Sequence, residues 1–281
     1  MKRLPPVLAA LALAITLAVA PGSAASAQPT GPVSAAPLAL PVSTTTVDVS
    51  QDGRRLSARL VQPTGSAPGA YPVVVFGHGF TQSPSRYAST LNALAARGYV
   101  VIAPGSQTGL FPDHSAFADD LWAAAVWAHR TQPNAHPSFD AVVGHSMGGG
   151  AAVLAASRHP ELETLATLAA AETRPSAVAA ARTVAAPGLF VVGSADTVVR
   201  PASTRAIFDA KPSPATWVSI TGGYHCGFLD SSSFLGLGCD RGSISRSTQL
   251  SISNALLGNW LDARFRGGAF AWPSSTVGEQ K

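Results

Sequence analysis

The chain has 281 residues, of which 46% are hydrophobic and 12% are charged, and its formal net charge is +4. This length allows one large hydrophobic core. Once the two basic residues at positions 2 and 3 are set aside, 17 basic side chains stand against 15 acidic ones, and no basic run accompanies this excess. The composition therefore argues against nucleic-acid binding, and we expect no nucleic acid among the partners.

The first residues carry the pattern of a secretory signal peptide. Two basic residues precede an apolar run from Val7 to Ala20, and an A-x-A cleavage pattern ends at Ala27. The alternative is a membrane anchor, but the run is about 14 residues long and a bilayer span takes roughly 20. We therefore expect a signal peptide over residues 1–27, export of the protein with cleavage of this segment, and no membrane span.

The remaining chain is expected to hold one domain. Residues 28–43 are rich in proline, alanine and small polar residues without periodicity, which is typical of an irregular lead-in. Residues 44–267 carry regular apolar runs without an internal repeat, and residues 268–281 are expected to form a C-terminal tail. We expect this domain to be a monomer.

The apolar runs alternate between strand and helix patterns. Two β-rich runs flank Asp52-Gly53, a strong signal for a hairpin turn. Further strands are expected at 71–76, 99–104, 139–144, 164–170, 188–193 and 216–221. Helices are expected at 86–98, 114–130, 149–160, 204–210 and 248–264. A hairpin followed by repeated β-α units predicts an α/β fold, with a mostly parallel eight-stranded sheet and helices on both faces.

One motif lies where an expected strand meets an expected helix. Residues 144–148, Gly-His-Ser-Met-Gly, fit G-x-S-x-G, which predicts a sharp turn that exposes the hydroxyl of Ser146 as a nucleophile. Gly144 and Gly148 would avoid side-chain clashes in so tight a turn. The alternatives are a chance match and a phosphate-binding loop, but the P-loop lysine is missing and the stretch does not fit G-x-G-x-x-G.

A serine hydroxyl needs a base, and His225 follows the expected strand 216–221. Its ordinary pKa near 6.5 suits it to accept and return the serine proton. Asp196 follows strand 188–193 and is expected to orient the imidazole. The alternative is that Asp196 only caps a turn and Asp230 is the acid. The histidines at 78, 129, 136, 145 and 159 are expected to be structural.

The stretches "GHGFTQS", "GHSMGGG", "GSADTVV" and "GGYHCGF" resemble the α/β-hydrolase superfamily. Within it, the chain is most similar to cutinase-like polyester hydrolases, secreted bacterial lipases and dienelactone-hydrolase-like esterases. The resemblance implies a Ser146-Asp196-His225 triad, in the chain order that this fold uses, and makes 44–267 the catalytic domain. Only about 18 residues separate strand 164–170 from strand 188–193. We therefore expect no cap domain.

The oxyanion hole is expected to use two backbone amides. One belongs to Met147, next to the nucleophile, and the other to Phe80, at the matching position of the family. Many polyester hydrolases carry tyrosine where Phe80 stands and a substrate-stacking tryptophan in the stretch that here reads "AAAETRPSA". Because this stretch has no aromatic residue, we expect soluble short to medium acyl esters to be cleaved faster than aromatic polyesters.

Cys226 and Cys239 are the chain's two cysteines. An even pair in an exported protein indicates a disulfide, and two free thiols are the alternative. No cluster of His, Cys or Asp has metal-ligand spacing, so we expect neither a metal ion nor a cofactor.

These features together predict a secreted serine carboxylic-ester hydrolase, of lipase or cutinase-like type, acting on small-molecule or polymeric esters. The alternatives are a peptidase or acyltransferase with the same triad, and a non-catalytic binding module with a hydrolase fold.

Overall fold

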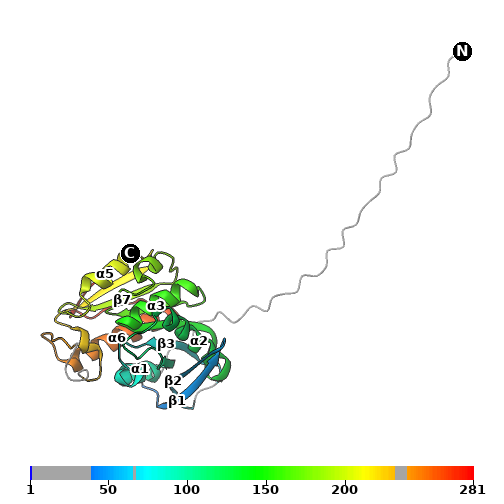
Figure 1. Ribbon diagram of the computed structural model, residues 1–281, viewed down its shortest axis with the longest axis horizontal. Coiled ribbons are helices and arrows are strands. Elements are labelled where there is room, and N and C mark those ends of the chain that lie inside the picture. The colour runs from blue at the N-terminus through cyan, green and yellow to red at the C-terminus, as the bar shows by residue number, and fades with distance from the viewer. Residues whose placement is uncertain (2–38, 66–67, 232–238) are drawn as a thin grey trace. The chain divides into compact units, whose positions relative to one another are not determined.

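The computed structural model describes Met1 and residues 39–65, 68–231 and 239–281 (Figure 1). The chain divides into two units, residues 1–31 and 32–281, and every helix and strand that is described belongs to the second unit. The expected signal peptide, apart from Met1, and most of the expected lead-in lie outside the described residues. Among the residues that are described, no helix has the length and apolar character needed to cross a membrane.

The core of the second unit is a nine-stranded sheet with the order β1-β2-β4-β3-β5-β6-β7-β8-β9. In Figure 1 the β1–β2 hairpin (blue) lies at one edge of the sheet, and β7 (yellow) lies nearer the opposite edge. The pairs β1–β2, β2–β4 and β8–β9 are antiparallel, and the other neighbours are parallel. The strands are β1 (Val42–Gln51), β2 (Arg54–Pro63), β3 (Tyr71–Gly77), β4 (Val100–Pro104), β5 (Ala135–His145), β6 (Thr164–Leu168), β7 (Gly188–Gly193), β8 (Ala215–Ile220) and β9 (Thr276–Gln280).

The hairpin turn forms at the expected residues. Asp52 and Gly53 have φ angles of 50° and 76°, the left-handed conformations that a two-residue turn between twisted strands requires. Glycine adopts such a conformation without strain, and aspartate tolerates it better than most residues do. The turn sets the β1–β2 register, which pairs Gln51 with Arg54.

Helices cover both faces of the sheet, as the α/β pattern predicts. The α-helices are α1 (Ala88–Ala96), α2 (His114–Thr131), α3 (Met147–Arg158), α4 (Ala177–Ala181), α5 (Pro201–Ala210) and α6 (Arg246–Phe265), and the 3₁₀ helices are η1 (Pro84–Tyr87) and η2 (His225–Phe228). Successive side chains of a strand point to opposite faces. In β3, Val73 and Val75 accordingly join one buried cluster, and Val74 and Phe76 join the other.

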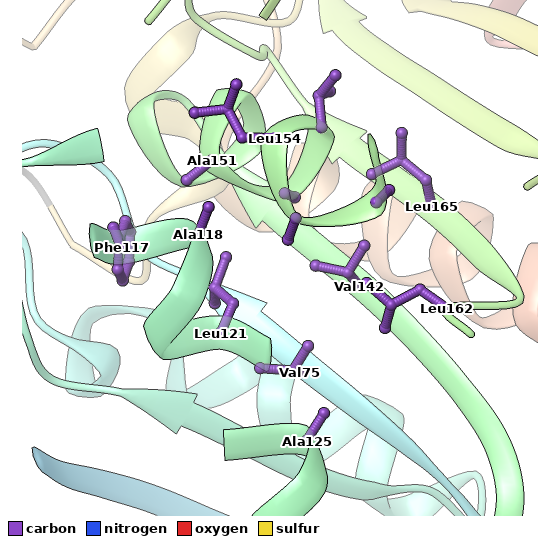
Figure 2. Close-up of a cluster of buried hydrophobic side chains, with 14 of the residues drawn as sticks. Val75, Phe117, Ala118, Leu121, Ala125, Val142, Ala151, Leu154, Leu162 and Leu165 are labelled. Atoms are coloured by element: carbon purple, nitrogen blue, oxygen red, sulfur yellow. The ribbon is translucent and has the colours of Figure 1, made fainter. Parts of the chain in front are cut away.

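The two clusters belong to different sets of helices. Val73 and Val75 lie in the cluster with α2, α3, α4 and α5, and Figure 2 shows Leu121 of α2 beside the strand residue Val75 in this layer. The other cluster contains α1 and α6, including the buried Trp260. Because both faces are covered, the central strands are apolar on both sides, which explains runs such as that of residues 72–76.

The sequence predicts eight strands, and the described part of the chain forms nine. The additional strand, β9, lies in residues 268–281, the expected C-terminal tail. It runs antiparallel to β8, with Thr216 paired to Gln280 and Ile220 paired to Thr276. Its sequence, Thr-Val-Gly-Glu-Gln, lacks an apolar run because an edge strand faces solvent. Hydrophobic periodicity therefore could not identify it.

The interval between β6 and β7 contains no cap domain. All of its residues are described, and they form one helix, the five-residue α4. Cis-Pro175 and the Ser176 side chain, which accepts a hydrogen bond from the amide of Ala179, precede and cap this helix. This interval thus holds one short helix, in agreement with the expectation of no cap domain.

Candidate active site

Ser146 occupies a single-residue turn between β5 and α3. Its backbone angles, φ 57° and ψ −121°, are unfavourable for a residue with a side chain. Three hydrogen bonds hold the turn: its amide donates to the carbonyl of Leu168 (2.9 Å), and its carbonyl accepts from the amides of Gly150 (3.1 Å) and Ala171 (2.9 Å). The neighbouring strand β6 and the loop that follows it thus fix a strained conformation, as expected for a nucleophile elbow.

The glycines of the motif allow backbones to approach closely at this turn. A Cβ atom on Gly144 would lie 2.2 Å from the carbonyl oxygen of Gly148. A Cβ on Gly148 would lie 2.2 Å from the carbonyl oxygen of Gly77, at the end of β3. No real Cβ contact is so short, so β3, β5 and the start of α3 can meet only because these positions lack side chains.

The structure brings Asp196 and His225 together at the ends of β7 and β8. Asp196 Oδ2 lies 2.8 Å from His225 Nδ1, and the Asp196 side chain is completely buried. Asp196 Oδ1 accepts from the amides of Val198 (3.0 Å) and Val199 (2.8 Å). Asp196 therefore caps a turn with one oxygen and orients the imidazole with the other. Since a carboxylate accepts, Nδ1 donates, and Nε2 is left with a lone pair for the role of base.

The His225 ring lies beside the elbow. Its centroid is 4.5 Å from that of His145, the residue before Ser146. Ser146 and His225 are both buried, with 7% and 5% of their surface exposed, so a proton exchanged between them would be largely shielded from bulk water. The catalytic roles of Ser146, Asp196 and His225, and the hydrogen bond between Ser146 Oγ and His225 Nε2, stay predictions.

Asp230, the alternative acid, has other partners. Its carboxylate accepts from the amide of Ser89 (3.1 Å) and from the hydroxyl of the same residue, at the start of α1. The other histidines have structural contacts: His129 pairs with Asp140, and the His159 ring stacks on Trp122 at 4.3 Å. Geometry thus favours Asp196 over Asp230 as the partner of His225.

A hydrogen-bonded chain joins the loop after β3 to the elbow. The amide of Gly79 donates to Tyr87 Oη (2.8 Å), and Tyr87 Oη in turn lies 2.9 Å from His145 Nδ1. Burial, and then the charge of nearby His225, hold the pKa of His145 well below its ordinary value. His145 is therefore neutral, and its Nδ1 shares a hydrogen bond with the Tyr87 hydroxyl. Sequence reasoning missed Tyr87 because it lies in an unremarkable amphipathic stretch.

This chain of hydrogen bonds fixes the loop that carries Phe80. A Cβ on Gly79 would lie 3.4 Å from Ser146 Cβ, so the loop passes directly beside the nucleophile. His78 is buried, with its ring nitrogens against the carbonyl oxygens of Gly79 (2.9 Å) and Ser106 (2.8 Å). Met147 is the first residue of α3, where an amide has no partner within its helix. The assignment of the Phe80 and Met147 amides to an oxyanion hole stays a prediction.

Cys226 and Cys239 form a disulfide, with their Cα atoms 5.3 Å apart. Cys226 directly follows His225 in η2, so the bridge ties the histidine loop to the segment that leads into α6. Within the described ranges, no group of three or more His, Cys, Asp or Glu side chains could hold a metal ion.

Comparison with known proteins points to one family. A family model described as chlorophyllase matches residues 38–187, more than half of the chain. Chlorophyllase-1 from Arabidopsis thaliana is 35% identical over 108 residues, which cover 36% of this chain and 33% of that protein. The matched part of this chain thus spans about a third of the length of the curated relative. The family match includes the elbow and the Phe80 loop and ends before Asp196 and His225.

We expect Gly144→Ala to destroy the elbow, because its methyl group would overlap the Gly148 carbonyl. A displacement of about 1 Å in Ser146 should lower ester hydrolysis by roughly 100-fold. The matched control is Gly109→Ala, since a Cβ at Gly109 meets nothing within 4 Å. Rates with p-nitrophenyl acetate, measured beside thermal unfolding, check this. Full activity in Gly144→Ala would contradict the close approach.

Proposed function

Because the chain belongs to the chlorophyllase family, we propose that it is a serine carboxylic-ester hydrolase that works through an acyl-enzyme. The observation that carries the proposal is the His225–Asp196 pair, with Nδ1 and Oδ2 2.8 Å apart, next to the Ser146 elbow. A nucleophile on a strained turn and an oriented base are the two components that acyl transfer by serine requires.

In the proposed mechanism, Ser146 Oγ attacks the ester carbonyl carbon while His225 Nε2 accepts the hydroxyl proton. Asp196 stabilises the imidazolium that forms. The Phe80 and Met147 amides donate to the oxyanion of the tetrahedral intermediate, where one such donor contributes about 3 kcal/mol. His225 then protonates the departing alcohol, and a water molecule, activated by the same base, hydrolyses the acyl-enzyme.

The absence of a cap between β6 and β7 supports a solvent-open site for bulky esters. Several exposed apolar side chains of the described residues stand on loops that follow the carboxyl ends of β3, β4 and β7, the sheet edge that carries Ser146. They are Phe80 (47% exposed), Leu110 (71%), Phe111 (97%) and Val198 (47%). Such side chains favour apolar acyl or alcohol groups. The family's name adds chlorophyll to the bulky esters that a substrate panel should contain.

The same triad would serve a peptidase or an acyltransferase, because it fixes the chemistry and not the leaving group. A non-catalytic binding module would have no need of the buried Asp196–His225 hydrogen bond. We favour the ester hydrolase because the family match is to esterases, and a fluorophosphonate probe separates the enzymes from the binding module.

We also propose that the protein is exported. The Cys226–Cys239 disulfide supports this, since such bridges persist in oxidising compartments. The basic and apolar pattern of residues 1–27 supplies the corresponding signal.

Ser146→Ala should remain folded and lose ester hydrolysis by about 10⁶-fold, because one hydroxyl forms the covalent bond. Asp196→Asn should lose up to about 10⁴-fold through the wrong imidazole tautomer. The control is Ser85→Ala, an exposed serine in η1, which should keep full activity. Rates with p-nitrophenyl esters and labelling by a fluorophosphonate check these changes. Labelling of Ser146→Ala would place the nucleophile elsewhere.

Without a cap, the enzyme should show no interfacial activation. The initial rate on tributyrin should follow a smooth saturation curve through the solubility limit, because no lid has to open at a droplet surface. A lidded lipase measured in parallel should show a sharp rise at that limit. A similar rise for this enzyme would contradict the open site.

Export should remove the leader at the A-x-A site. When the gene is expressed in a secreting bacterial host, the protein recovered outside the cytoplasm should begin at Gln28, as read by N-terminal sequencing or intact mass. A variant with Ala27→Arg should slow this cleavage, because the site requires a small residue. Recovery of the whole chain in the cytoplasm, with Met1 intact, would refute the export proposal.

A further inference from the structure

One carboxylate outside the triad binds the backbones of both catalytic loops. Asp240 Oδ2 accepts from the amides of Thr197 (3.0 Å) and His225 (3.0 Å), and Asp240 Oδ1 accepts from the amide of Cys226 (3.0 Å). Thr197 directly follows Asp196. Asp240 thus joins the residue after the expected acid to the expected base itself.

We propose that Asp240 is a positioning residue that sets the distance between Asp196 and His225. The two side chains come from different loops, so their separation depends on how those loops are held together. Hydrogen bonds from backbone amides to a carboxylate are about twice as strong as those between neutral groups. Three of them converge on Asp240, which makes it a rigid bridge at the hydrogen bond that orients the base.

Other contacts join the same loops before the catalytic residues. The amide of Ala195 donates to the carbonyl of Gly223 (2.8 Å), and the amide of Gly222 donates to Ser194 Oγ (2.8 Å). These bonds align the ends of β7 and β8. Asp240 joins the two loops again at Thr197 and at His225 itself. The Asp196–His225 hydrogen bond therefore lies between two sets of contacts that hold the loops together.

The disulfide holds Asp240 in place. Asp240 follows Cys239, and the bridge links Cys239 to Cys226, whose amide is one of the three donors. The bond therefore anchors the carboxylate at the loop that it binds. In this arrangement the disulfide serves the geometry of the triad through Asp240 as well as the stability of the fold.

This inference rests on the proposed esterase function, and the test separates the two. Asp240→Asn has the same shape, but its amide nitrogen cannot accept a hydrogen bond, so at least one of the three bonds is lost. Asp240→Glu keeps the negative charge but adds a methylene group, which displaces the carboxylate from the three amides. The matched control is Asp113→Asn, because Asp113 also accepts from a backbone amide, that of Ala116 (2.9 Å), but at the start of α2.

The hydrolysis of p-nitrophenyl acetate is measured with kcat expressed per active site titrated by fluorophosphonate, so that unfolded molecules do not count. For Asp240→Asn we expect kcat to fall 10- to 100-fold with KM within about twofold, since a displacement near 1 Å affects the chemical step. Asp240→Glu should be intermediate, fluorophosphonate labelling should slow in parallel, and Asp113→Asn should match the wild type.

A kcat per titrated site within twofold of the wild type in both Asp240 variants would overturn the positioning role. A rise in KM at constant kcat would also overturn it, because Asp240 would then act on substrate binding. Failure of the esterase function has a different signature, in which the wild type itself neither hydrolyses esters nor reacts with the fluorophosphonate.

Discussion

The close approach of three backbone segments at Gly77, Gly144 and Gly148 is the constraint on which the site depends. A Cβ at any of them would lie within 2.9 Å of a backbone oxygen. Their contact lets α3 start directly at the sheet edge and holds Ser146 at φ 57°. It also brings the loop after β3 beside the nucleophile, so that the nucleophile and both expected oxyanion donors share one rigid support.

The other half of the site depends on charge and burial. Asp196 has a completely buried side chain, and its carboxylate has three hydrogen-bond donors, two amides and His225 Nδ1. A buried carboxylate with all of these hydrogen bonds can stabilise an imidazolium in the low-dielectric interior. His145 lies against the same ring, and burial lowers its pKa, so it does not oppose that charge.

The elements of the structure differ in how well the sequence predicts them. The central strands and the Asp52-Gly53 turn could be predicted from periodicity and turn chemistry. The residue type at each of these positions matches its burial or its φ angle. β9 could not be predicted in this way, since an exposed edge strand carries no apolar signal. Ser146, Asp196 and His225 could be selected because strands 139–144, 188–193 and 216–221 end just before them. Tyr87 and Asp240 carry no comparable local mark.

The sequence by itself determined the α/β class, the elbow motif and the residues expected to form the triad, because glycine spacing and strand ends are local properties of the chain. Only the tertiary structure decided that Asp196, and not Asp230, lies against His225, since the choice depends on which loops meet. It also decided that Tyr87 and Asp240 bind those loops. A hydrogen bond between residues far apart in the chain leaves no periodic pattern and arises only when the sheet brings their strands together.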